Sequence, residues 1–169
     1  MAEINSIADP TTGVVFIHAA PNALCPHVEW TLASLLDATG ALDWTEQPAK
    51  SGTRKAVVDW IGPVGTGARL ADALGKWNML AFEVTEDPSD LVDGERFCHT
   101  PELGMWRGQT GASGDVCIPE NRIRHLMQRG PVAFSAAMED ELGSAWDDAL
   151  EPLRGIAGGA EVTWLSRVG

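Results

Sequence analysis

Basic side chains are scarce in this sequence. Its 169 residues contain 12 Lys and Arg against 24 Asp and Glu, which gives a formal net charge of −12 at pH 7. A protein that binds a nucleic-acid phosphate backbone or an anionic lipid surface electrostatically needs clustered positive charge. We therefore expect no nucleic acid among its partners and no electrostatic attachment to a membrane.

Long apolar runs and export signals are also missing. Residues 1–13 contain two acids, no basic residue and no apolar stretch of signal-peptide length. The longest apolar stretch, residues 13–20, is far shorter than the roughly 20 residues that cross a bilayer. The cysteines are three, widely spaced and without a CxxC motif, which favours reduced thiols over disulfides. These absences predict a cytoplasmic protein with no membrane insertion.

The common catalytic signatures are absent too. The chain has no Walker A motif, GxGxxG fingerprint, GxSxG elbow or HExxH helix, and its acidic stretch lacks the spacing of an EF-hand. We therefore expect no cofactor and favour a protein without catalytic activity. A small enzyme stays open as the alternative.

The pattern of apolar residues indicates an α+β fold. Alternating or β-branched segments predict strands at residues 14–19, 42–46, 56–61 and 79–85. Apolar faces at helical spacing, Val28 with Leu32 and Leu70 with Leu74, predict helices at residues 26–40 and 66–77. The resulting order is strand, helix, strand, strand, helix, strand. It is the order of a ferredoxin-like βαββαβ sandwich, an antiparallel sheet with two helices on one face.

The second half of the chain predicts an extension of this core. Short strands are expected at residues 96–99, 105–109 and 115–118, followed by a helix at 119–130, one long helix with an apolar face from Met138 to Leu153, and a terminal strand around Val162 and Trp164. We expect residues 83–95, which hold six carboxylates, to form a solvated loop. The prediction is a single α+β domain over residues 1–169, with its core at 14–85 and a strand and helix extension at 96–167 on a mostly antiparallel sheet.

A glycine-rich turn is the best candidate for ligand binding. GPVGTGARLA at residues 62–71 places Gly65, Thr66 and Gly67 at the start of a predicted helix, where free N–H groups and the helix dipole attract anions. Arg69 lies one turn further and would assist a phosphate of coenzyme A or phosphopantetheine. The alternative is a purely structural turn, which needs glycine for its backbone angles and Thr66 as a helix cap.

Cysteine and histidine side chains could form a metal site or a catalytic thiol, but their spacing in the sequence matches neither. Cys25, His27, Cys98 and His99 are residue types that bind zinc, yet adjacent strand residues such as Cys98 and His99 point to opposite faces of a sheet. Cys25 at a helix start, with His27 close by, has the setting of an activated thiol but no third orienting residue. We favour buried, structural cysteines and no metal.

Two groups of residues are candidates for contact with a partner. The chain has seven Trp and no Tyr, and Trp106 with Arg107 lies among glycines in an expected surface hairpin, while the other Trp residues, Trp30 among them, fit the core. Arg122, Arg124 and Arg129 form a basic cluster with His125 between two acidic stretches, residues 83–95 and 139–151. They either pair with those acids internally or face an acidic protein such as an acyl carrier protein.

Several blocks together resemble a known family. They are TTGVVFIHAAPNALCPHVEW at 11–30, WIGPVGTGARLADAL at 60–74, FEVTEDPS at 82–89, RFCHTPELG at 96–104 and GAEVTWLSR at 159–167. The chain resembles an actinobacterial domain-of-unknown-function family, which carries no established catalytic residues. The resemblance implies a setting in fatty-acid synthesis, beside acyl-carrier-protein enzymes and acyl-CoA carboxylase β subunits.

The favoured function is a non-catalytic accessory or regulatory subunit that binds an enzyme complex of fatty-acid or acyl-CoA metabolism. The alternative is a small enzyme or ligand-binding protein for an anionic acyl thioester such as a coenzyme A derivative, held at the Gly62–Arg69 turn. A tight homo-oligomer with a structural role is a third hypothesis.

Overall fold

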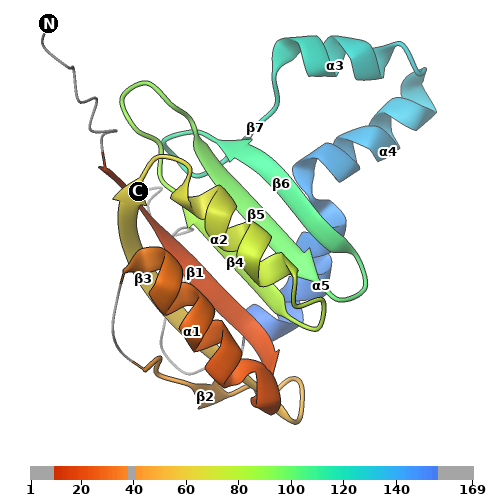
Figure 1. The fold of residues 1–169 in the computed structure, drawn as a ribbon. Coiled ribbons are helices and arrows are strands. Elements are labelled where there is room, and N and C mark those ends of the chain that lie inside the picture. Colours follow the sequence, from red (N-terminus) through yellow and green to blue (C-terminus); the bar gives the residue numbers. More distant parts are fainter. Residues whose placement is uncertain (1–9, 38–40, 156–169) are drawn as a thin grey trace, which may run out of the picture.

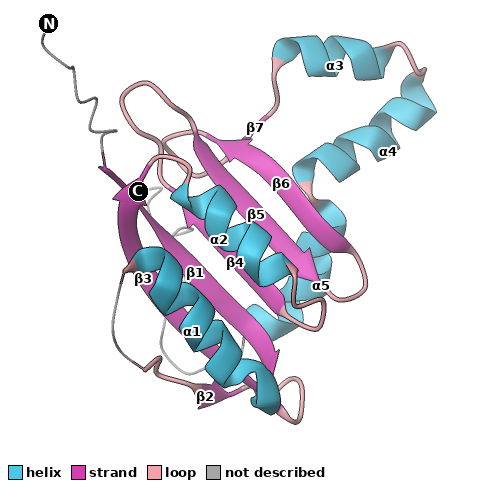
Figure 2. Cartoon of the chain, in the orientation of Figure 1, coloured by secondary structure: helices cyan, strands magenta, loops and turns pink. Residues whose placement is uncertain are grey.

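A seven-stranded antiparallel sheet organises the molecule (Figures 1 and 2). The computed structural model describes residues 10–37 and 41–155. Its strands are β1 (Pro10–Pro21), β2 (Thr45–Glu46), β3 (Thr53–Pro63), β4 (Ala81–Glu86), β5 (Gly94–Thr100), β6 (Gly104–Thr110) and β7 (Val116–Cys117). Its helices are the short 3-10 helix η1 (Asn22–Leu24) and α1 (Cys25–Leu36), α2 (Thr66–Gly75), α3 (Glu120–Met127), α4 (Pro131–Leu142) and α5 (Ser144–Arg154).

The predicted α+β fold is confirmed. The strand order β2-β3-β1-β4-β5-β6-β7 contains the ferredoxin-like core at one end, and the later strands continue the same sheet beyond β4. β2 is shorter than predicted and pairs only with Arg54 and Lys55. The preceding residues turn toward α1 instead, because the backbone N–H of Leu42 and the indole of Trp44 both donate to the Glu29 carboxylate.

Helices α1 and α2 cover one face of the sheet and enclose the larger core (Figure 1). The predicted apolar faces are confirmed, since Val28, Leu32, Leu70 and Leu74 are at most 2% exposed. They pack with strand residues whose side chains alternate onto the same face. The central ones are Val15, Ile17, Trp60, Phe82 and Val84.

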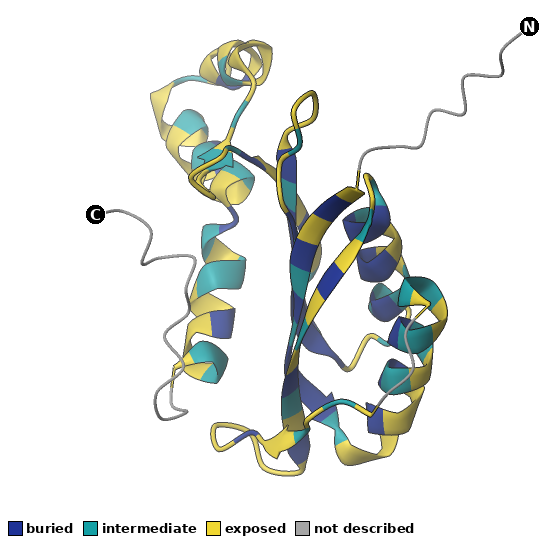
Figure 3. Cartoon of the chain, turned by 90° about the vertical axis from the view of Figure 1, so that its left-hand side faces the viewer, coloured by how far each residue is buried: buried dark blue, intermediate teal, exposed yellow. Residues whose placement is uncertain are grey.

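Helix α5 lies on the opposite face, which we call the α5 face (Figure 3). It builds a second, smaller core with Leu150 at its centre. The strand residues in this core are Ala19, Ala81, Cys98 and Trp106. The sheet is therefore packed on both sides, although α5 covers less of it than α1 and α2 do.

The single long helix predicted across Met138 to Leu153 is wrong. The structure has two helices there, and Gly143 ends α4 and precedes α5 with φ of 74° in the left-handed region. A Cβ atom at this position would lie 2.8 Å from the Trp106 ring. Gly143 therefore turns the chain and makes room for an indole, which a periodicity of apolar residues does not reveal.

Trp30 also differs from its prediction as a core residue. Its side chain lies on the outer side of α1 and is 74% exposed. The predicted terminal strand at Val162 and Trp164 lies outside the described residues.

We predict that Gly143→Ala destabilises the protein by more than the ~1–2 kcal/mol that a left-handed backbone costs a residue with a side chain. The added methyl group must also displace the Trp106 ring. Urea unfolding measures the change. Gly114→Ala is the control, because Gly114 has φ of 84° but no atom within 4 Å of the place that a Cβ atom would occupy. Equal losses in the two variants would show that contact with Trp106 is unimportant.

Candidate functional site

The glycine-rich turn before α2 already holds an anion, the carboxylate of Glu86. The backbone N–H of Gly65 donates to Glu86 Oε1 at 2.7 Å, and that of Gly67 donates to Oε2 at 2.6 Å. Gly67 lets the carboxylate approach, since a Cβ atom there would lie 2.8 Å from Oε2. Glu86 in β4 thus caps α2 from a distant part of the chain.

The other two candidates at this turn have separate roles. Thr66 begins α2 rather than preceding it, and its hydroxyl donates to the carbonyl oxygen of Pro63. Arg69 is exposed to solvent one turn along. An external phosphate would have to displace Glu86 from the turn, because the two N–H groups that face it are already used.

We predict that Glu86→Ala lowers stability by about 1–3 kcal/mol and creates a phosphate site. The cost follows from two helix N–H groups left without their charged acceptor. Inorganic phosphate should then raise the melting temperature of the variant but not of the native chain. Glu95→Ala, which removes a carboxylate that pairs with Arg107, is the control. Phosphate binding at this turn in the native chain, measured by amide shifts of Gly65 and Gly67, would contradict the prediction.

The four metal candidates do not converge. Cys98 packs in the smaller core on the α5 face, whereas the ring of His99 stacks on Phe82 and its Nδ1 lies 2.7 Å from the carbonyl oxygen of Leu80 on the other face. His27 is exposed on α1 beside Trp77. Across residues 10–37 and 41–155, no group of three or more His, Cys, Asp or Glu side chains is placed to bind a metal ion.

The cysteines at the two cores have the environment of structural thiols. Cys25 is 6% exposed, and burial raises its pKa although Arg54 opposes the shift. Burial and the Glu83 carboxylate raise the pKa of Cys98 to about 12. Both thiols are thus held in the unreactive, protonated form. Cys117 on β7 is exposed.

Trp106 is not the surface residue that its glycine-rich surroundings suggested. It is 7% exposed, donates its indole N–H to the carbonyl oxygen of Asp140, and lies under the Arg96 guanidinium. A Cβ atom at Gly108 would clash with its ring, so the glycine provides space for the indole. Its neighbour Arg107 does reach solvent, where it pairs with Glu95. Of the two residues predicted to contact a partner, Trp106 and Arg107, only Arg107 lies at the surface.

Helices α3 and α4 stand away from the sheet as an arm, residues 120–142 (Figures 1 and 3). α3 packs on α4, and α4 continues into α5 through Gly143. Arg122 pairs with Glu141, and Arg124 pairs with Glu120 on its own helix. Part of the basic cluster is thus neutralised within the arm, while Arg129 is exposed at the turn between its helices.

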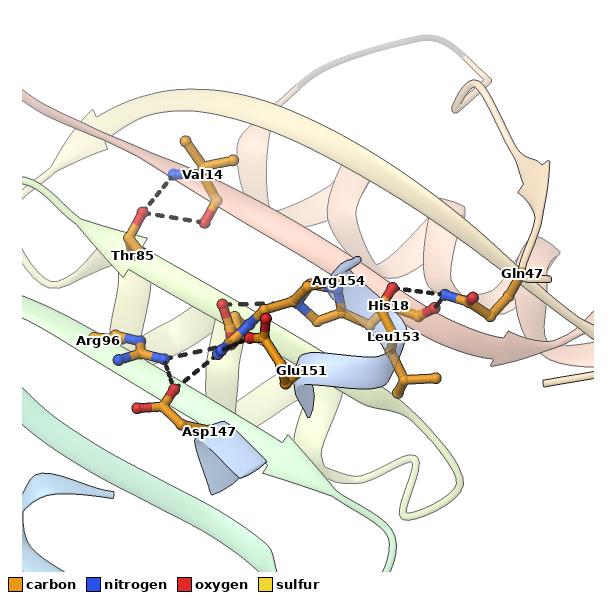
Figure 4. Close-up of polar contacts among 10 residues, drawn as sticks. Val14, His18, Gln47, Thr85, Arg96, Asp147, Glu151, Leu153 and Arg154 are labelled. Atoms are coloured by element: carbon orange, nitrogen blue, oxygen red, sulfur yellow. Dashed lines mark hydrogen bonds and ion pairs between the residues drawn. The ribbon is translucent and has the colours of Figure 1, made fainter. Parts of the chain in front are cut away.

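A buried ionic cluster on the α5 face was not foreseen. Glu83, expected in a solvated loop, lies in β4 and is 2% exposed. It pairs with Arg154 from α5 and with Arg96 from β5, and both guanidinium groups also reach Asp147 of α5 (Figure 4). His18 Nε2 lies 3.6 Å from Glu83 Oε2. The cluster joins α5 to three strands.

The neighbours of Glu83 determine its ionisation. Burial alone would raise its pKa, but the His18 imidazole and the Arg154 and Arg96 guanidinium groups outweigh burial and lower the pKa from its ordinary 4.5 to about 2. A carboxyl group whose pKa is lower in the folded state stabilises the fold above its unfolded pKa. This stabilisation is lost as the pH falls from about 4.5 toward 2.

We predict that Glu83→Gln destabilises the protein at pH 7 by about 3 kcal/mol, the equivalent of this pKa shift. The difference from the native chain should shrink as the pH falls from about 4.5 to 2, because Glu83 itself becomes protonated there. Urea unfolding at several pH values measures it. Glu120→Gln, which removes one exposed ion pair, should cost well under ~1 kcal/mol. A Glu83→Gln penalty that stays constant with pH would contradict the assignment.

A groove of about 520 Å³ opens on the α5 face beside the ionic cluster. Val14 and Phe16 of β1 line one side, and Thr85, Arg96 and Thr110 lie across from them. The loop at residues 111–114 closes one end. Four acidic residues, Glu83, Glu86, Asp87 and Glu95, also line the groove against the single guanidinium of Arg96, so the groove is unsuited to a free anion.

None of the helices in the described part of the chain has the length and apolar character needed to span a bilayer.

Comparisons with known proteins place the chain in a family. No curated protein and no solved structure matches the chain. The model of a family described as protein of unknown function, DUF3145, matches residues 14–167, nearly the whole length. The chain therefore belongs to the DUF3145 family.

Proposed function

We propose that this protein is a non-catalytic accessory subunit that binds an enzyme complex through its α3–α4 arm. The observation that carries the proposal is the surface of α4. Seven of its first eight residues, 131–138, are apolar, with Ser135 the exception. Ala137 is the one buried residue of the helix, and Val132 is 86% exposed.

Such a helix is expected to be enclosed. A helix with apolar residues all around normally lies inside a protein, because water on any side leaves apolar surface uncovered. Here Ala137 is buried and Phe134 and Met138 are half-buried, whereas Val132, Ala133 and Ala136 are exposed to solvent. A contiguous exposed apolar surface on a projecting element is typical of a protein interaction site.

Arg129, at the turn between the helices of the arm, favours a partner with carboxylates near that point. Met127 at the end of α3 is 62% exposed and lies in sequence beside Arg129, which is exposed at the arm's turn. The chain as a whole is strongly acidic, so this local positive charge orients a partner rather than attracting one over long distance. The matching surface is an apolar groove bordered by carboxylates.

The proposed partners follow from the resemblance to an actinobacterial family linked with fatty-acid synthesis. We take them to be cytoplasmic enzymes of fatty-acid or acyl-CoA metabolism, either an acyl-CoA carboxylase or an enzyme that uses acyl carrier protein. The alternative function, binding of an anionic acyl thioester at the Gly62–Arg69 turn, has less support, because Glu86 holds the anion position there.

We predict that Val132→Glu weakens binding to the partner enzyme at least tenfold, equivalent to about 1.4 kcal/mol, while the protein stays folded. A charge placed in the apolar contact would lose its hydration without gaining a partner. Purified acyl-CoA carboxylase β subunit and acyl carrier protein are the probes, and calorimetry measures the dissociation constants.

The matched control is Leu91→Glu, since Leu91 is 95% exposed but lies in the loop after β4, far along the chain from the arm. It should bind as the native chain does. Equal binding by the native chain and Val132→Glu would refute the arm as the contact surface. Absence of binding to either probe would refute the proposed partners.

A further inference from the structure

The solvent side of α1, which we call the α1 face, carries no carboxylate. It consists of four exposed residues at helical spacing, Pro26, His27, Trp30 and Ser34. Trp30 is the most prominent of them, with 74% of its surface exposed. The one acid within α1, Glu29, is turned away from this face, because its carboxylate accepts from the backbone N–H of Leu42 and the indole of Trp44. A chain with 24 Asp and Glu among 169 residues thus has a surface helix whose outer side is uncharged.

The hydroxyl groups on and beside the α1 face already have partners. The Thr31 hydroxyl donates to the carbonyl oxygen of His27 at 2.8 Å, and the Ser34 hydroxyl donates to the carbonyl oxygen of Thr31 at 3.0 Å. Burial of a hydroxyl is costly only where it lacks a hydrogen bond. Covering the α1 face would therefore leave neither hydroxyl without a partner.

This composition is typical of the centre of a protein interface. There, charged residues are depleted and Trp is enriched, and Trp is among the residues that contribute most to binding. The neighbouring helix α2 exposes charges of both signs, those of Arg69, Asp72 and Lys76. Charge therefore lies beside the α1 face rather than on it, as in an apolar interface with a polar rim.

The charge of the chain favours a second copy as the occupant of this face. A different protein that recognises so acidic a chain would gain from contact with its carboxylates, and the α1 face offers none. Two copies, each with a net charge of −12, repel each other and can approach closely only where acids are absent. The α1 face meets that condition.

The position of Trp30 suits a symmetric contact. It lies at the middle of α1, whose 12 residues run from Cys25 to Leu36. In a dimer with two-fold symmetry, a residue at the axis meets its own copy. Antiparallel α1 helices centred on Trp30 would bring the two indole rings together and place each His27 opposite Ser34 of the second copy. Their helix dipoles would then point in opposite directions, which is favourable.

We propose that the protein forms a reversible dimer with two-fold symmetry through the α1 face, with the two Trp30 rings at its centre. Twelve helical residues extend about 18 Å, so the contact is smaller than the roughly 800 Å² per partner of a standard interface. The dimer is therefore weak, with a dissociation constant on the order of 10–100 µM. The arm lies on the other side of the sheet from α1 and stays free (Figure 3).

Sedimentation velocity of the full-length chain tests this proposal. Between about 5 and about 500 µM, the native chain should shift from monomer to dimer. Added salt should tighten the dimer, because it screens the repulsion between two acidic copies and leaves the apolar contact intact. Over the same range of concentrations, the NMR signal of the Trp30 indole N–H should shift, a measurement that requires no variant.

Trp30→Lys should raise the dissociation constant at least tenfold, since two ammonium groups would face each other at the axis. The variant adds a positive charge to an acidic chain, so a loss of dimer would not come from greater overall repulsion. Leu91→Lys is the matched control. It makes the same change of charge at a side chain that is 95% exposed in the loop between β4 and β5, and it should dimerise as the native chain does.

Two results would overturn the proposal. One is a native chain that stays monomeric up to about 500 µM. The other is a Trp30→Lys variant that dimerises as tightly as the native chain, which would assign the contact to another surface. Neither result would affect the proposed function of the arm, because that rests on residues 120–142 and a separate binding measurement.

Discussion

Two buried carboxylates on one central strand govern how the helices sit on the sheet. Glu83 and Glu86 of β4 are three residues apart, so their side chains point to opposite faces. A buried carboxylate is tolerated only when it is hydrogen-bonded or paired. Glu86 meets this need with the N–H groups that begin α2, and Glu83 meets it with Arg96 and with Arg154 of α5. Each face therefore has one helix anchored electrostatically to the same strand.

The position of α5 has consequences at both of its ends. At its start, Gly143 and the Trp106 ring beneath it turn the chain, so that α3 and α4 project from the sheet with the apolar surface of α4 uncovered. At its end, Arg154 is held over β4 by Glu83, and the carbonyl oxygen of Leu153 accepts a hydrogen bond from Gln47. One anchored helix thus accounts for the projection of the arm and for the exposed apolar residues that it carries.

The net charge of −12 overstates the acidity of the surface. Glu83 and Glu86 are buried with their partners, and Asp147 and Glu141 are engaged by arginines. These acids come from the two acidic stretches that the sequence shows, yet they serve to hold helices in place. The basic residues of α3 are partly neutralised in the same way. Within the arm, Arg129 is exposed, whereas Arg122 and Arg124 are paired with glutamates.

The order of helices and strands up to residue 86, and the apolar faces of α1 and α2, can be read from the amino-acid sequence alone, because both follow from periods of 3.6 and 2 residues. The same periods do not reveal which acids are buried, that Trp106 is enclosed while Trp30 is exposed, or that a helix ends at Gly143. Those outcomes depend on partners far away in the chain: Glu83 and Arg154 are 71 positions apart. Folding brings such groups together, and burial then decides whether a charge is paired or solvated.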